Sequence, residues 1–323
     1  MSSAEKRAFN QIRRVYQEGF GPLLVPDMEE IHEAALRLAR QNLRAQPGAR
    51  SGVIMDGIST VGKSTIAMQL GRRYERLLTK NHTITRTPTG NVFLPVAFVN
   101  LPGEVSIMNF NYLLARFYNI PFSKNVKEGD LTDRIKDHAA DCCTSMVILD
   151  DIHFLRIKNR SHETVNNHFK HLANSISATF VYAGINVEGS GLLSEGNNPE
   201  NKILSQTAHR FKRFELLPFD YNQTKSREDF VKVLTSFEDN LLLFEQTKGS
   251  LVSVMAEYIW DRTGGFIGPM SALIREGAAL AIKRNTEQIT IKLLGDIKLD
   301  FDSEQQFKLC RKKYKASGQK STA

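Results

Sequence analysis

The stretch of sequence that decides the fold is Gly57-Ile58-Ser59-Thr60-Val61-Gly62-Lys63-Ser64-Thr65. It matches G-x-x-x-x-G-K-[ST], the pattern of a loop whose backbone N–H groups cradle phosphates. The apolar run Val53-Ile54-Met55 before it predicts a short buried strand, and residues 64–78 after it predict a helix. The loop therefore lies between a strand and a helix N-terminus, where backbone donors and the helix dipole favour negative charge.

Each fixed position of this loop has a chemical reason. Gly57 and Gly62 allow the backbone to turn tightly and to approach phosphates without a Cβ in the way. The Lys63 ammonium is expected to reach the β and γ phosphates of a nucleotide, and the Ser64 hydroxyl to hold Mg²⁺. A chance match to the fixed positions occurs in roughly 1% of chains of this length. With the strand and the helix included, the sequence predicts a nucleotide-binding protein.

Composition restricts the class of protein. A chain of 323 residues is long enough for about two domains with a sizeable core. It has no run of about 18 apolar residues and no apolar signal core near its start, so we expect no membrane partner. The three cysteines do not suggest a disulfide framework, which favours a cytoplasmic location. The net charge of +8 favours a polyanionic partner, although many basic proteins bind no nucleic acid.

Strand and helix patterns alternate through the first two-thirds of the chain. Three further apolar segments predict strands and three amphipathic segments predict helices: strands at 94–100, 146–149 and 178–184, and helices at 109–118, 130–140 and 164–175. Such alternation is typical of a mostly parallel sheet. Near residue 220 the alternation stops, and the patterns that follow are helical, at 227–237, 250–263 and 269–283. The sequence thus predicts an α/β core followed by a small helical domain.

We expect four regions along the chain. They are a helical arm over residues 1–46, a nucleotide-binding core over 47–220, a helical domain over 221–300, and a basic, disordered tail over 301–323. The arm contains two helical patterns, the second capped by Asp27. We expect the arm to pack beside the core, with docking to a partner protein as the alternative.

A second motif follows in Met146-Val147-Ile148-Leu149-Asp150-Asp151, a continuous apolar run that ends in two acids. In a parallel sheet, ligands lie at the carboxyl ends of the strands. Asp150 is therefore expected to hold the Mg²⁺ shell, and Asp151 to polarise the attacking water; alternatively, the two acids cap the following turn. The next strand ends at Gly184-Ile185-Asn186. The Asn186 amide is a candidate to orient the same water, or else an ordinary turn residue.

Two arginines stand before the last apolar run of the core, in the segment Gln206-Thr207-Ala208-His209-Arg210-Phe211-Lys212-Arg213-Phe214-Glu215-Leu216. An arginine presented to the γ-phosphate of a neighbouring subunit raises the rate of phosphoryl transfer by about 10³–10⁵. Arg210 and Arg213 are the candidates for such a finger. The alternative for each of them is an ordinary surface arginine.

Taken together, these segments resemble an AAA+ ATPase, and more closely the TniB/TnsC family, the regulatory ATPases of DNA transposition. The resemblance rests on residues 57–65, 146–153, 181–186 and 206–211, and it covers roughly residues 20–285. Family members often show Q-L-A-[SR]-R-F before the last core strand. Here Gln206-Thr207-Ala208-His209-Arg210-Phe211 is similar to that segment, which places the finger on Arg210 and leaves Arg213 as the second candidate.

The resemblance implies a three-layer AAA+ core of the α/β class with a mostly parallel sheet, and a small, all-helical C-terminal lid. It implies ATP as the nucleotide, bound together with Mg²⁺. It also implies an ATP-loaded ring or filament on double-stranded DNA that couples target-site selection to a transposase. The expected partners are therefore duplex DNA, further copies of the chain, a transposase and a target-selection protein.

Two departures from the family pattern matter. The residue that polarises water is usually glutamate, whereas Asp151 is one methylene shorter, so we expect slow hydrolysis. Many AAA+ lids carry an arginine that touches the γ-phosphate, but the matching segment, residues 263–270, contains none. Arg275 lies a turn or more further on. The lid thus departs from the pattern of nucleotide sensing, while the core chemistry remains.

Non-specific binding to DNA requires basic side chains that neutralise backbone phosphates without reading bases. The candidates lie in two segments predicted to be loops or the start of a helix: Lys124 and Lys127 in one, and Arg156, Lys158 and Arg160 in the other. The alternative for each of these side chains is a solvated charged loop.

Three other interpretations remain open. A replication initiator or helicase loader has the same fold, although the sequence predicts no winged-helix module after the lid. A monomeric P-loop kinase has no use for an arginine acting on a neighbour, and a scaffold binds nucleotide without turnover. Size-exclusion elution with ATP analogue and DNA separates the kinase from an oligomer, and single-turnover hydrolysis identifies the scaffold.

Overall fold

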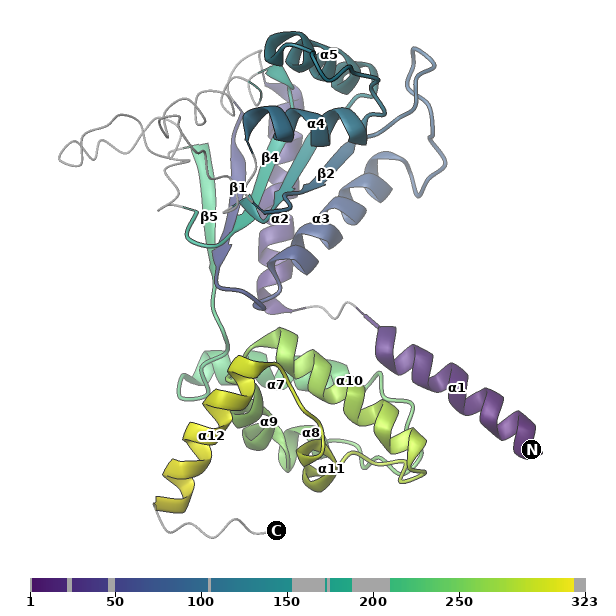
Figure 1. The fold of residues 1–323 in the computed structure, drawn as a ribbon, viewed down its shortest axis with the longest axis vertical. Coiled ribbons are helices and arrows are strands. Elements are labelled where there is room, and N and C mark those ends of the chain that lie inside the picture. Colours follow the sequence, from purple (N-terminus) through teal and green to yellow (C-terminus); the bar gives the residue numbers. More distant parts are fainter. Residues whose placement is uncertain are drawn as a thin grey trace, which may run out of the picture. The chain divides into compact units, whose positions relative to one another are not determined.

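The computed structural model describes residues 2–21, 25–45, 50–103, 106–152, 172, 175–187 and 210–316 (Figure 1). Its helices and strands are, in chain order, α1 (Ser3–Gly19), α2 (Pro26–Arg44), β1 (Gly52–Gly57), α3 (Lys63–Leu78), β2 (Val96–Asn100), α4 (Ile107–Phe117), α5 (Glu128–Asp141), β3 (Met146–Asp150), β4 (Thr179–Gly184), β5 (Phe211–Leu216), α7 (Thr224–Glu238), α8 (Ser250–Ser253), α9 (Ala256–Thr263), α10 (Ile267–Lys283), α11 (Ile291–Gly295) and α12 (Phe301–Ala316). The helix expected at 164–175 lies almost entirely outside the described residues. No helix in the described part of the chain is long and apolar enough to cross a membrane.

The described strands form a five-stranded sheet in the order β2-β3-β4-β1-β5, and every neighbouring pair is parallel. β1, which leads into the phosphate-binding loop, lies between β4 and β5. Its register pairs Val53 with Val181 on one side and with Lys212 on the other. Because the strands run the same way, the segments that follow β1, β3 and β4 emerge at one edge of the sheet. The mostly parallel sheet expected from the sequence is confirmed.

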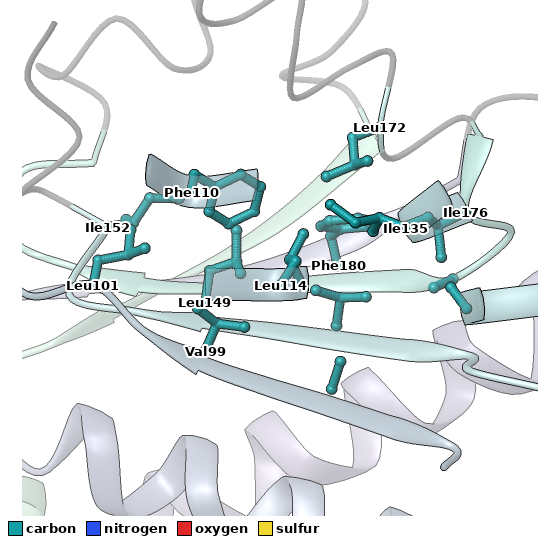
Figure 2. Packing of buried hydrophobic residues seen from close by; sticks show 14 of the residues in the cluster. Val99, Leu101, Phe110, Leu114, Ile135, Leu149, Ile152, Leu172, Ile176 and Phe180 are labelled. Carbon is teal, nitrogen blue, oxygen red and sulfur yellow. The ribbon is translucent and has the colours of Figure 1, made fainter. Parts of the chain in front are cut away.

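Helices cover both faces of the sheet, which explains the unbroken apolar runs of its central strands. On one face α3 packs so closely at Gly71 that a Cβ there would lie 3.1 Å from the Ile148 side chain. On the other face α4 and α5 bury Phe110 and Ile135 in one cluster with Leu149 (Figure 2). Successive residues of a strand point to opposite faces, so Ile148 and Leu149 serve different layers. The core therefore has the expected three layers.

The chain divides by its internal contacts into two compact units. The first comprises Met1–Pro26, Thr60–Gly62 and Leu217–Ala323, and the second comprises Asp27–Ser59 and Lys63–Leu216. The second unit contains the sheet. Within the first unit, the Gly268 N–H donates to the Thr60 carbonyl at 3.0 Å. The sheet-bearing unit ends at Leu216, four residues before the boundary expected at 220.

The first unit has an apolar core of its own, made by helices. Phe230 of α7, Leu273 of α10 and Leu293 of α11 belong to this core and are buried. The packing of α10 is close at Gly277, where a Cβ would come within 2.8 Å of the Leu294 side chain. The all-helical domain expected after the sheet is thus present.

The first 46 residues do not form a single arm. α1 belongs to the helical unit, where Arg13 is 3% exposed and pairs with Glu287 at 2.7 Å. α2 belongs to the sheet-bearing unit, where the His32 ring bonds to the Ile66 carbonyl at 3.0 Å. The expectation of one arm differs from the structure because the spacing of apolar residues shows which face of a helix is buried, and not which partner covers it.

The tail expected to be disordered over residues 301–323 contains a helix instead, α12 (Phe301–Ala316). The Asp300 carboxylate accepts the Ser303 N–H at 3.0 Å and so caps its first turn. The Arg262 guanidinium, itself buried, pairs with Glu304 at 2.7 Å across 42 residues of chain. A cap and a long-range ion pair therefore order a segment whose basic composition suggested disorder.

Candidate functional site

The phosphate-binding loop connects the end of β1 at Gly57 to the start of α3 at Lys63. Its backbone enters the left-handed region twice, at Thr60 with φ 65° and at Gly62 with φ 95°. A φ of this sign at Gly62 is readily adopted only without a Cβ. A loop that winds tightly into a helix N-terminus suits an anion, because the first N–H groups of the helix have no partner within it.

The other side chains of the loop differ in exposure. Ile58, Ser59 and Thr65 are exposed, whereas Val61 is buried. Val61 therefore anchors the loop through its side chain. The exposed positions leave the loop surface open to solvent, so a bound phosphate would meet backbone and not a packed apolar surface.

The Lys63 side chain folds back over the loop. Its ammonium group donates to the carbonyl oxygens of Gly57 at 2.8 Å and of Ile58 at 2.7 Å, and only 6% of the residue is exposed. Burial lowers the pKa of Lys63, and the negative charges of three carboxylates near the ends of β1 and β3 oppose this shift. A buried cation held between loop carbonyls and acids is positioned to meet phosphate oxygens.

Asp150, the last residue of β3, is 3% exposed. Burial raises the pKa of its carboxyl group, whereas a hydrogen bond from the Ser64 side chain lowers it. Its Oδ1 also accepts the Asp151 N–H at 3.0 Å. A serine hydroxyl and a carboxylate therefore meet beside the loop. Oxygen ligands of this kind suit Mg²⁺, which binds through one or two carboxylates and keeps several waters, so the residues present fit the metal.

Asp151 and Asn186 follow two neighbouring strands of the sheet. Asp151 comes directly after β3 and has φ 57°, and Asn186 comes two residues after β4 and has φ 49°. Asp and Asn adopt this left-handed backbone more readily than most residues. Asp151 is half-buried and Asn186 is exposed. Because β3 and β4 are parallel neighbours, both residues stand at the edge of the sheet where the phosphate-binding loop emerges.

Arg213 makes an ion pair within its own chain. Its Nη2 lies 2.9 Å from Oδ2 of Asp56, a buried residue of β1 just before the phosphate-binding loop. The Asp56 charge also acts on Lys63. The sequence interpretation missed Asp56, although an acid inside a buried apolar strand requires a partner and is itself a signal. This ion pair distinguishes Arg213 from Arg210.

Arg210 stands at the other end of the same strand. It directly precedes β5, whose register pairs Phe211 with Gly52 and Leu216 with Gly57. The side chain is exposed, and it forms no ion pair with any residue that the structure describes. β5 has six residues, which span about 20 Å at roughly 3.3 Å per residue. Arg210 therefore lies at the sheet edge opposite to its own phosphate-binding loop.

Arg275 of the helical unit binds the end of α1. Its guanidinium donates to the carbonyls of Glu18 and Phe20 and lies 5.1 Å from the Phe20 ring centroid. Burial lowers the pKa of Arg275. The side chain thus satisfies carbonyl groups that the helix end leaves without partners. This role explains an arginine at a position that does not match the sensing arginine of AAA+ lids.

The structure describes only two of the five basic side chains that are candidates for DNA binding. Lys124 and Lys127 are exposed and precede α5, where Lys127 occupies the N-cap position without a side-chain cap. A lysine is unfavourable at the positive end of a helix dipole, so its place there is not explained by helix stability. Arg156, Lys158 and Arg160 lie outside the described residues.

Comparison with known proteins assigns the chain to a fold and to a family. Two solved structures are similar over most of the chain. The Orc1 protein of Aeropyrum pernix in complex with DNA has 14% identity and a TM-score of 0.58, covering 91% of this chain and 69% of that one. Cdc6p from Pyrobaculum aerophilum has 13% identity and a TM-score of 0.57, covering 92% and 83%. At such identities the likeness shows the fold alone, which is that of the AAA+ ATPases.

Sequence comparison gives the closer assignment. No curated protein matches the sequence. The family model described as "Bacterial TniB protein" matches residues 27–221, which is well over half of the chain and includes the loop, the two acids and both arginines. The protein therefore belongs to the TniB family of AAA+ proteins.

Proposed function

We propose that this protein is an ATP-dependent DNA-binding ATPase, which assembles on target DNA in the cytoplasm and couples target-site selection to a transposase. The observation that supports the proposal most directly is the junction of Ser64, Lys63 and Asp150 at the phosphate-binding loop of a TniB-family chain. A loop built in this way binds a nucleotide triphosphate with its metal. The family resemblance supports the link to transposition.

Each residue of the site is assigned a separate chemical role. Loop N–H groups and the Lys63 ammonium bind the phosphates, and Ser64 and Asp150 hold Mg²⁺. When bound, ATP with its metal supplies the γ-phosphoryl group and neutralises part of its charge. Asp151 is assigned to orient and polarise the water that attacks, and Asn186 at the neighbouring strand end to hold it in line. The shorter reach of Asp151, relative to glutamate, favours slow turnover.

The position of Arg210 supports catalysis between subunits. A strand of about 20 Å separates it from its own loop, so its guanidinium cannot reach its own γ-phosphate. A planar, permanently charged group suits the charge that develops on the phosphoryl group. We therefore assign Arg210 as the finger that a subunit presents to its neighbour's ATP. Arg213, paired with Asp56, is assigned to its own subunit.

DNA binding is expected to be strongly salt-dependent and nearly independent of sequence. The charge of +8 and the basic side chains at Lys124 and Lys127 act on backbone phosphates, so bound counterions are released. With ATP analogue present, log Kobs should fall linearly with log salt concentration, by about 0.9 for each neutralised phosphate. Filter binding of several unrelated duplexes over a salt series measures this. A flat slope, or no binding at all, would contradict the proposed function.

The form of the assembly tests the proposal against a replication protein. Electron microscopy with ATP analogue and duplex DNA should show rings or helical filaments that enclose the duplex. An assembly that forms only on single-stranded DNA would instead support a helicase loader. A protein that stays monomeric with both ligands would refute assembly on DNA altogether.

Asp151→Asn is expected to preserve ATP binding and to slow hydrolysis. The substitution keeps shape and hydrogen bonding but removes the charge that polarises water. Because general-base catalysis typically contributes about 10²–10⁴-fold, the hydrolysis rate should fall by a factor in that range. Phosphate release under single-turnover conditions measures it, and assemblies on DNA should persist longer. Asp150→Asn is the matched control, because it should weaken Mg²⁺-dependent ATP binding instead. Identical ATP and Mg²⁺ affinities in the two variants would show that our division of roles is wrong.

A further inference from the structure

Basic side chains gather along the end of α3 and the segment that joins it to β2. Arg72, Arg76, Lys80 and Arg86 are exposed, and none of them forms an ion pair with another described residue. Residues 76–103 contain no aspartate or glutamate. In Figure 1 the segment between α3 and β2 projects beside the sheet. We call residues 80–93 the α3–β2 hairpin.

The α3–β2 hairpin is held by its own hydrogen bonds. Arg86 and Val92 form an antiparallel bridge, and the Thr87 N–H donates to the Asn91 carbonyl at 2.8 Å. The Arg86 guanidinium lies over the tip and donates to the Gly90 carbonyl at 3.4 Å. A segment ordered in this way presents its charges at fixed positions, so binding requires less loss of conformational entropy.

The turn into the hairpin is strained. Lys80, Asn81 and His82 all have left-handed backbones, with φ of 48°, 56° and 68°. This conformation costs roughly 1–2 kcal/mol for most residues with a side chain, and Asn and His adopt it more readily than others. The Thr79 hydroxyl accepts the His82 N–H at 3.0 Å, and the Asn81 N–H donates to the Arg76 carbonyl at 2.8 Å, so surrounding bonds hold the turn. Strain that is held in this way is concentrated at functional sites.

We propose that the α3–β2 hairpin and the last turns of α3 bind the sugar–phosphate backbone of duplex DNA. The hairpin leads into the start of β2, so this contact lies at the sheet edge opposite to the phosphate-binding loop. The proposal rests on the proposed function, because it adds a second contact to the DNA on which the protein assembles. It is separate from the contact assigned to Lys124 and Lys127.

The arrangement of charge favours duplex DNA over an acidic protein. Arg72 and Arg76 are four residues apart on α3, about 6 Å along the helix axis, and Lys80 follows two residues after the helix ends at Leu78. Duplex DNA presents phosphates at short, regular intervals, and Arg, Lys and Thr side chains are their usual ligands. Two acids lie at this surface: Glu75 of α3 stands between Arg72 and Arg76 and is half-buried, and Glu29 of α2 pairs with Arg73. The basic side chains outnumber them, so the surface keeps a positive charge.

The test compares two triple variants that remove equal charge. One is Arg76→Gln with Lys80→Gln and Arg86→Gln; the matched control is Lys225→Gln with Lys248→Gln and Lys283→Gln, three exposed lysines of the helical unit. With ATP analogue, duplex binding is measured from low to high salt. The hairpin variant should bind at least tenfold more weakly, with a salt slope shallower by about 2–3, while the control stays near the wild type.

Each result decides the proposal. Equal effects in the two variants would mean a diffuse effect of net charge and would overturn it, although the proposed function would stand. A wild-type protein that binds no duplex would overturn both. ATP affinity checks that the variants fold. Should the hairpin variant not fold, protection of Lys80 from acetylation by duplex DNA in the wild type gives the answer, and unchanged acetylation overturns the proposal.

Discussion

Lys63→Ala should abolish ATP binding or weaken it more than a hundredfold. Lys63 is the only charged side chain among residues 57–65, and its ammonium sits between the loop carbonyls of Gly57 and Ile58. Removing one partner of a buried, charge-assisted contact costs about 3 kcal/mol or more, which is over two orders of magnitude in Kd. Titration with a fluorescent ATP analogue measures the change, and ATP-dependent DNA binding should be lost with it.

Arg72→Ala is the matched control for this variant. It also removes one positive charge from α3, at an exposed position further along the helix. It should leave ATP affinity within about twofold of the wild type, since an exposed charge at that separation is largely screened. Unchanged ATP affinity in Lys63→Ala would refute the phosphate-binding role of the loop.

Arg210→Ala should leave ATP binding intact and reduce hydrolysis by about 10³-fold or more. The large effect is expected because a finger acts on charge that develops only during the reaction. Binding is expected to survive because Arg210 precedes β5 at the edge away from its own loop. Equilibrium ATP titration and steady-state phosphate release, both in the presence of duplex DNA, measure the two quantities.

Mixing variants tests whether Arg210 acts on its neighbour. A mixture of Arg210→Ala and Lys63→Ala subunits should recover part of the activity, because some interfaces then combine an intact loop with an intact finger. Arg213→Ala mixed with Lys63→Ala should not recover it, since Arg213 pairs with Asp56 beside its own loop. No recovery with Arg210→Ala, in subunits shown to co-assemble, would mean that Arg210 acts within its own subunit or not at all.

The sequence predicted the parts of the site that depend on local chemistry. A phosphate-binding loop needs its glycines, its lysine and its hydroxyl at fixed spacing, so residues 57–65 identify it without tertiary information. Asp150 was likewise predicted from a buried strand ending in acid, and the structure brings it to Ser64. The continuous apolar runs predicted a sheet covered on both faces, and the structure confirms the parallel order.

What the sequence did not predict depends on contacts between distant segments. Arg13 pairs with Glu287 across 274 residues, and that pair, with others, assigns α1 to the helical unit. Arg213 and Asp56 are 157 residues apart. No local pattern reports such partners, because periodicity reports only the buried face. A charged residue in an otherwise apolar segment, such as Asp56, is the sequence feature that indicates such a contact, because a buried charge requires a partner.

The separation of Arg210 from its own loop gives the assembly a polarity. If each active site joins the loop of one subunit to the finger of the next, the two surfaces in contact are different, and a two-fold dimer cannot complete either site. Such head-to-tail contacts close into a ring or continue as an open helix. An open helix has one complete site fewer than it has subunits, whereas a closed ring has as many. Its two ends also differ, with an unmatched loop at one and an unmatched Arg210 at the other, so a partner that recognises one end arrives from one direction along the DNA.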